Sequence, residues 1–99
     1  MSTFVLPAPS ALGYTIFTKR DCGDCEKVKA FLTSKALSFN AIECDDFLVN
    51  DREAFIVAAR EAMGASSALP VRFPLVFAQG AYVGGYQATR RHVISEEEW

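Results

Sequence analysis

The sequence predicts a single α/β domain in which helices flank a four-stranded mixed sheet. Short strand-like runs and amphipathic helical segments follow one another in the order β-α-β-α-β-β-α. The length of 99 residues suits one compact domain with a core of its own. Hydrophobic residues make up 51% of the chain and charged residues 22%, which is typical of a globular protein and not of a disordered one.

The N-terminal segment, residues 1–12, contains Pro7 and Pro9 and no charged side chain, so it is predicted to be an extended lead-in. The domain itself is then expected to cover residues 13–99. Its first strand is predicted at residues 13–18, where β-branched and aromatic residues alternate.

The first helix is predicted over residues 24–35, because Val28, Phe31 and Leu32 follow one another at i, i+3 and i+4 and form an apolar stripe. A second strand is predicted at residues 37–44. Three of its side chains are expected to face the core, namely those of Phe39, Ala41 and Ile42.

Residues 45–50 are predicted to form a loop before the second helix. Asn50 has the position of an N-cap, and Glu53 completes a capping box for a helix over residues 51–63 that ends at Gly64. The apolar stripe of this helix consists of Phe55, Ala58, Ala59 and Ala62.

The C-terminal third is predicted to contain a hairpin and a short helix. A loop at residues 65–72 leads to a third strand at 73–78, and a tight turn connects it to a fourth strand at 81–84. A helix is expected at residues 87–94, with 95–99 as a frayed tail. A right-handed crossover is expected to make the first two strands parallel.

Two of the three cysteines, Cys22 and Cys25, form a C-x-x-C motif at the first strand-to-helix turn. Three is an odd number and too few for a disulfide scaffold, so a catalytic or metal-binding role is the better interpretation of the pair. Cys22 is expected at the helix N-terminus, where free backbone N–H groups favour a thiolate. Cys25, one turn later, is expected to face inward. This division gives an exposed nucleophile and a protected resolving thiol.

Charged side chains surround the pair, with Lys19 and Arg20 favouring negative charge on the first sulfur and Asp21 and Asp24 opposing it. The sequence leaves the sign of this balance open.

Two other interpretations of the pair are structural thiols without any chemistry and part of a zinc site. Zinc normally takes four ligands, and only Cys44 and His92 remain as candidates, without paired spacing, so no metal is expected. Cys44 is more simply interpreted as a small buried residue.

Two downstream motifs favour the redox interpretation. A C-x-x-C motif at the first strand-to-helix turn of this layout indicates a thioredoxin-like fold. In that fold a proline at the start of the third strand lies across from the cysteine turn, and Pro74 has this place. With a cis peptide bond before it, the backbone of Phe73 would point out beside the sulfur. Gly84 and Gly85 lead into a helix start whose N–H groups can bind a carboxylate.

Together these motifs resemble the glutaredoxin family. The family pattern of a Lys three residues before C-x-x-C, then T-V-P, then G-G-x-x-D, is similar to the segments at Lys19, at residues 72–74 and at residues 84–88. The resemblance covers most of the chain. It implies a thiol-disulfide oxidoreductase with glutathione as reductant and co-substrate, in which Cys22 forms the mixed disulfide and Cys25 resolves protein disulfides.

The resemblance also implies a glutathione site. Lys19 would meet the glycyl carboxylate, and the backbone of Phe73 before Pro74 would pair with the cysteinyl part. The segment after Gly85 would hold the γ-glutamyl end. The other binding residues predicted in this way are Arg72, Gln87 and Ala88.

This chain departs from the family pattern at four positions. Gly23 and Asp24 stand where a Pro and an aromatic residue are usual between the cysteines. Arg72 replaces the Thr of T-V-P and could clamp a carboxylate. Ala88 replaces the Asp of G-G-x-x-D, so the expected partner of the glutathione amine is missing.

Composition also limits the partners. A net charge of −2 and a pI near 5.3 give no global reason to expect nucleic acid or an anionic membrane. No apolar run approaches the roughly 18 residues of a membrane span, and the opening residues do not read as a signal peptide. A cytoplasmic monomer that acts on disulfide-containing proteins is expected. Arg90, Arg91 and His92 are expected on a solvated surface, and Tyr82 and Tyr86 in the core or a groove wall.

Two alternative functions remain open. The first is a thioredoxin-like electron donor, for instance to ribonucleotide reductase, reduced by a flavin-dependent reductase instead of glutathione. The second is a non-enzymatic carrier in which two chains share an iron–sulfur cluster through Cys22 and glutathione.

Overall fold

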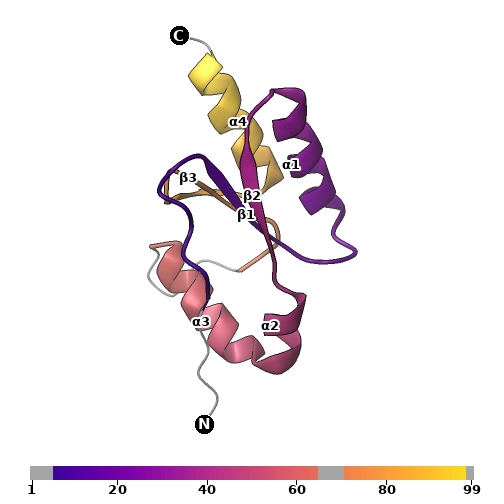
Figure 1. Ribbon diagram of the computed structural model, residues 1–99, viewed down its shortest axis with the longest axis vertical. Coiled ribbons are helices and arrows are strands. Elements are labelled where there is room, and N and C mark those ends of the chain that lie inside the picture. The colour runs from indigo at the N-terminus through magenta and orange to yellow at the C-terminus, as the bar shows by residue number, and fades with distance from the viewer. Residues whose placement is uncertain (1–5, 65–70, 98–99) are drawn as a thin grey trace.

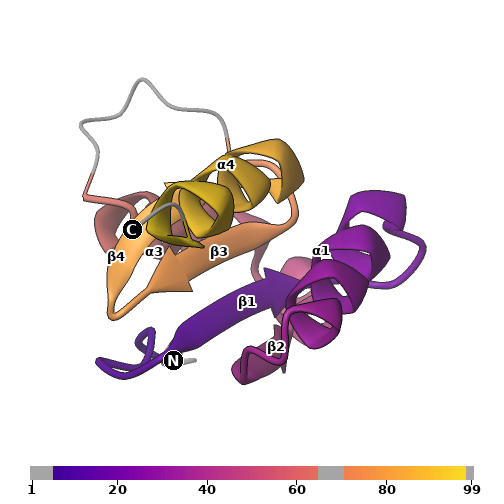
Figure 2. The same ribbon diagram turned by 90° about the horizontal axis from the view of Figure 1, so that it is seen from above.

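The computed structural model describes residues 6–64 and 71–97. The helices and strands within these ranges are β1 (Tyr14–Thr18), α1 (Gly23–Ser34), β2 (Phe39–Glu43), α2 (Asp45–Asn50), α3 (Arg52–Ala62), β3 (Leu75–Ala78), β4 (Ala81–Gly84) and α4 (Tyr86–Glu97). The strands form one sheet in the order β2-β1-β3-β4, which Figure 2 shows from above. Strand β1 runs parallel to β2 and antiparallel to β3, and β3 and β4 form a hairpin. The predicted mixed sheet is confirmed.

Helices cover both faces of the sheet. Helices α1 and α4 lie side by side on one face, while α3, with α2 beside it, lies on the other (Figure 1). Successive side chains of a strand point to opposite faces, so Ile16 packs with α1 and α4 whereas Phe17 packs with α3. The same alternation in β3 sends Val76 toward α1 and Phe77 toward α3. Both faces of the two central strands are therefore buried.

Strand β2 corrects one expectation about the core. It is an edge strand, and Ala41 is exposed rather than buried. Phe39 and Ile42 are half-buried and belong to different clusters, because an odd separation along a strand places them on opposite faces of the sheet. The three residues therefore do not share a core face.

The predicted loop at residues 45–50 is wrong, because these residues form the short helix α2. Its N-cap, Cys44, makes no side-chain capping hydrogen bond, so the sequence lacks an N-cap signal there. Phe47 and Leu48 pack against the α3-side core. The N-cap of α3 is Asp51, whose Oδ1 accepts a hydrogen bond from the Ala54 N–H at 3.1 Å. Asn50 cannot serve as this cap because it ends the preceding helix.

Helix α4 is longer than predicted and includes residues 95–97, which were expected in the frayed tail. Lys35 Nζ lies 3.0 Å from Glu97 Oε1, so the last turn is tied to the end of α1. The guanidinium of Arg90 lies 5.9 Å from the ring centroid of Phe31 and 5.8 Å from that of Tyr86. Of these contacts, the ion pair of Glu97 is the one that holds the last turn, beyond the predicted helix, in place.

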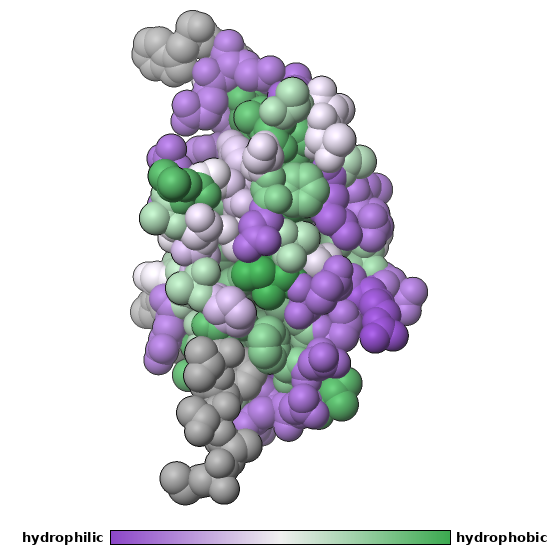
Figure 3. Space-filling model, viewed as in Figure 1, coloured by the Kyte–Doolittle hydropathy of each residue, from purple (hydrophilic) through white to green (hydrophobic). Residues whose placement is uncertain are grey.

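The last points concern the predicted loop at residues 65–72, membrane-spanning helices and the molecular surface. Of the loop predicted at residues 65–72, only Val71 and Arg72 lie in the described ranges. No helix in the part of the chain described here is long and apolar enough to cross a membrane. Figure 3 shows mostly hydrophilic residues along the side formed by α1 and α2, and hydrophobic residues along the middle of the same face.

Gly84 fixes the entry into α4. Its φ is 135°, and a Cβ there would lie 2.7 Å from the Cβ of Ala88. We expect Gly84→Ala to lower the free energy of unfolding by about 2–4 kcal/mol, through backbone strain and steric overlap. Urea unfolding at neutral pH measures this change.

Gly23→Ala is the matched control, since a Cβ at Gly23 would meet no atom within 4 Å. We expect it to change the unfolding free energy by less than about 1 kcal/mol. Equal effects of the two substitutions would contradict the packing described for Gly84.

Candidate active site

The C-x-x-C motif lies where the central strand β1 leads into α1. Cys22 is the N-cap of α1, with an extended backbone at φ −117° and ψ 104°. Its Sγ accepts a hydrogen bond from the backbone N–H of Cys25 at 3.2 Å. The N–H of Arg20 donates to Asp45 Oδ1 at 3.1 Å, so the turn is also held against α2. The first sulfur is thereby placed at the positive end of the helix.

The two sulfurs have different environments. Cys22 is half-buried, whereas Cys25 is fully buried. Burial raises the pKa of the Cys25 thiol, and its hydrogen bond with the Cys22 side chain raises it further. Interactions with Thr18 and Lys19 act in the opposite direction but do not reverse the shift. The inner thiol is therefore shielded and holds its proton, while the outer sulfur can be reached from solvent.

Cys44 is also fully buried, as predicted. Burial is the main cause that raises the pKa of its thiol to about 12. Cys44 therefore carries almost no thiolate at neutral pH.

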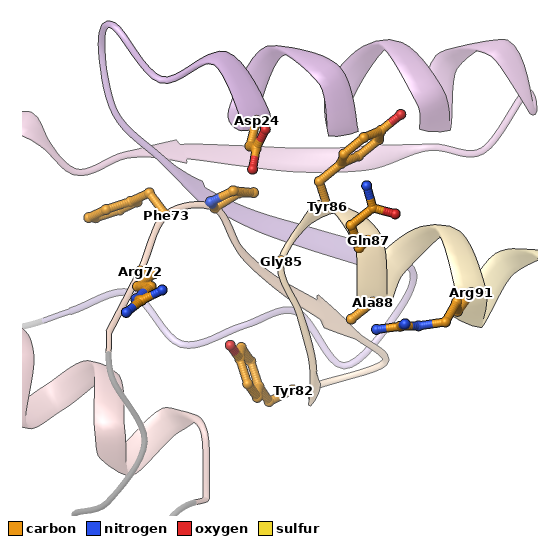
Figure 4. Close-up of a pocket in the computed structure, with 10 residues that line it drawn as sticks. Asp24, Arg72, Phe73, Tyr82, Gly85, Tyr86, Gln87, Ala88 and Arg91 are labelled. Carbon is orange, nitrogen blue, oxygen red and sulfur yellow. The ribbon is translucent and has the colours of Figure 1, made fainter.

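A groove of about 450 Å³ lies beside the cysteine turn. The predicted site residues that line it are Arg72, Phe73, Pro74, Gly85, Gln87 and Ala88. The peptide bond between Phe73 and Pro74 is cis. The segment before β3 and the start of α4 are distant in sequence. In the structure they face each other across this groove (Figure 4).

Further residues lining the groove were not assigned to the site from the sequence. Asp24 extends over the groove from the start of α1, while Arg91 lies on the α4 side near Ala88 (Figure 4). Arg91 is exposed, as expected, but its groove position was missed. The signal was present, because residues three apart on a helix share a face and Arg91 follows Ala88 by three. Tyr82 and Tyr86 are groove-wall residues.

All predicted binding residues lie in the described part of the chain, and Lys19 is the one among them that does not line this groove. It lines an adjoining cavity of about 300 Å³ with Arg52, and Arg72 and Phe73 border both spaces. The Nζ of Lys19 lies 5.6 Å from the centroid of the Phe73 ring. The sequence did not predict that Arg52 lines this cavity, because its position depends on how α3 packs against the sheet and no local sequence pattern indicates that packing.

The arrangement suits thiol-disulfide exchange next to an extended, charged ligand. An accessible sulfur at a helix start can become a thiolate, and a shielded thiol one turn away can displace it from a mixed disulfide. Basic side chains in both cavities suit carboxylate groups. Among the described residues, no group of three His, Cys, Asp or Glu side chains is placed to hold a metal ion.

Comparisons with known proteins agree with this chemistry. A family model described as Glutaredoxin matches residues 14–83. A search of curated proteins gives no significant match. Among solved structures, the holo form of glutaredoxin C1 from Populus tremula x tremuloides has 26% identity and a TM-score of 0.66, covering 89% of this chain and 80% of its own.

Two other plant structures are similar. A buckwheat glutaredoxin in complex with glutathione has 25% identity and a TM-score of 0.63, over 84% of this chain and 70% of its own. A wheat glutaredoxin has 30% identity and a TM-score of 0.60, over 81% of this chain and 71% of its own. The family match, the fold and the cysteine turn lead to one conclusion: this chain belongs to the glutaredoxin family of thiol-disulfide oxidoreductases.

Proposed function

We propose that the protein is a glutathione-dependent reductase of glutathione mixed disulfides and protein disulfides, acting as a cytoplasmic monomer. The observation that carries this proposal is the asymmetry of the cysteine pair. Cys22 is accessible at the start of α1 beside a charged groove, while Cys25 is buried with a raised pKa. Cys22 is then the nucleophile and Cys25 the resolving thiol.

Reduction of a glutathione mixed disulfide needs only the first cysteine. The Cys22 thiolate attacks the glutathionyl sulfur of R–S–S–G, so that a Cys22–glutathione disulfide forms as the substrate S–S bond breaks. The leaving thiolate R–S⁻ takes up a proton from solvent. A second glutathione thiolate then attacks the glutathionyl sulfur on Cys22, which regenerates the Cys22 thiolate and forms oxidised glutathione.

Reduction of a protein disulfide needs both cysteines. Cys22 attacks one sulfur of the disulfide and forms a mixed disulfide with the partner, whose second sulfur leaves as a thiolate. The Cys25 thiolate then attacks Cys22 Sγ, releasing the reduced partner and leaving an internal Cys22–Cys25 disulfide. Two glutathione molecules reduce this bond in turn.

The two cavities support a binding mode for glutathione. Lys19 and Arg52 offer positive charge to the glycyl carboxylate in the smaller cavity. The backbone of Phe73 lies on the border of both cavities, where the cysteinyl part would pair with it. The larger groove then receives the γ-glutamyl end, next to Gly85 and Gln87. The solved glutathione complex of the buckwheat relative supports this class of ligand.

A second candidate is an electron donor that is reduced by a flavin-dependent reductase. The observation that favours it is Ala88, because α4 contributes no carboxylate to the groove for the glutathione amine.

The reductant distinguishes these two candidates. We expect the protein to reduce a glutathionylated peptide rapidly with glutathione, glutathione reductase and NADPH, and slowly with thioredoxin reductase and NADPH. Absorbance of NADPH follows both reactions. Cys22→Ser should lower the glutathione-dependent rate at least about 100-fold, because the nucleophile is lost. Turnover with thioredoxin reductase and none with glutathione would favour the second candidate.

The buried thiol makes a separate prediction about pH. The pKa of Cys25 lies above its ordinary value of 9.0, so the thiolate that resolves protein mixed disulfides becomes abundant only at higher pH. We expect single-turnover release of a reduced protein partner to keep rising above pH 9. Cys25→Ser should abolish this release but leave reduction of the glutathionylated peptide intact.

Cys44→Ala is the control for removal of a buried thiol, and it should change neither reaction. A release rate that levels off below pH 9, or loss of both reactions in Cys25→Ser, would contradict the assigned role of Cys25.

A further inference from the structure

The charges around the larger groove are distributed unevenly. Among the residues that line it, the charged side chains are those of Asp24, Arg72 and Arg91. Asp24 comes from α1 and overhangs the groove, whereas Arg72 lies on the side of the segment before β3 and Arg91 on the side of α4 (Figure 4). Within this lining the only carboxylate therefore belongs to the cysteine turn.

The carboxylate of Asp24 is available to a ligand. Its side chain is 59% exposed, and its ion pair with Lys27, at 3.8 Å between Asp24 Oδ1 and Lys27 Nζ, is itself exposed and too long for a hydrogen bond. Arg72 and Arg91 make no ion pair with any residue in the described ranges. A carboxylate from α1 and guanidinium groups from the segment before β3 and from α4 thus line the same groove.

The γ-glutamyl end of glutathione carries an ammonium and a carboxylate on the same carbon. Placed between Asp24 and Arg91, this group has one favourable orientation, with the ammonium toward Asp24 and the carboxylate toward Arg91. The reverse orientation would place the ammonium beside the Arg91 guanidinium and the carboxylate beside the Asp24 carboxylate, and both contacts repel.

We propose that Asp24 determines specificity for the γ-glutamyl group by binding its ammonium, while Arg91 binds its α-carboxylate. This inference rests on the proposed function, in which glutathione is the ligand. It makes the acidic residue between the cysteines a substrate-binding residue, and it explains how a groove with Ala88 on α4 can still hold the amine.

Asp24 also lies close to Cys22, so its removal can change the reaction by a second route, through the charge on the nucleophile. Asp21 provides a matched control for that route. It is adjacent to Cys22 and exposed, but it does not line the groove. Its φ is 54°, a conformation that Asn adopts readily, so Asp21→Asn removes the charge without a backbone penalty.

The test compares two substrates that differ only in the ammonium. One is a fluorescent peptide in mixed disulfide with glutathione. The other is the same peptide in mixed disulfide with the glutaryl analogue of glutathione, which lacks the α-amino group and keeps both carboxylates. Single-turnover fluorescence gives the second-order rate constant of the first step for wild type, Asp24→Asn and Asp21→Asn.

We expect wild type to prefer the glutathione substrate, and Asp24→Asn to lower the ratio of the two rate constants by about three- to tenfold, the size of one charge-assisted contact at an exposed site. Asp21→Asn should leave the ratio unchanged, whatever it does to both rates. Arg91→Gln should lower both rates by a similar factor, because both substrates carry the α-carboxylate.

A ratio that Asp24→Asn does not change would overturn the proposal, as would equal rates with both substrates in wild type. Arg91→Gln with no effect on either rate would overturn the role of Arg91. A wild-type protein that reacts with neither substrate would instead contradict the proposed function itself, so the two failures are distinguishable.

Discussion

The hydrogen bond from the Cys25 N–H to the Cys22 sulfur is the interaction on which the site depends. It makes a cysteine the N-cap of α1, a position more often held by Ser, Thr, Asp or Asn. The sulfur is therefore held where backbone N–H groups converge and where the turn opens to solvent. The same helix geometry sends the side chain three residues later into the core. The N-cap position and the helix that follows it thus place both the accessible sulfur and the shielded thiol.

The rest of the molecule positions the residues that line the groove around this turn. Strand β1 is paired on both sides and buried on both faces, so its end is a rigid base for the cysteines. Antiparallel pairing with β3 brings the Phe73–Pro74 segment beside them, and the hairpin then directs α4 to the opposite wall. Gly84 permits that direction because its positive φ and missing Cβ let α4 come close. The groove is a consequence of sheet topology, while its charge pattern comes from a few exposed side chains.

The sequence predicted the features that are encoded locally. The alternating pattern of β1 and the apolar stripe of α1 led to the right elements, and the cysteine motif identified the right turn. Helix α2 was missed because six residues without a side-chain cap give no clear period. The exposure of Ala41 depends on strand order, which local sequence does not specify. Arg52 lines the smaller cavity only through tertiary packing, and for the same reason the sequence did not show that Lys19 lines this separate cavity.

The central claim is that glutathione is bound covalently at Cys22 and lies along the two cavities. The most direct measurement is to trap the mixed disulfide in Cys25→Ser with oxidised glutathione and to map the adduct by mass spectrometry and amide NMR. We predict a single glutathione on Cys22, with shift changes at the backbone amides of Phe73, Gly85 and Gln87. An adduct on Cys44, no adduct, or shift changes confined to the cysteine turn would contradict the account.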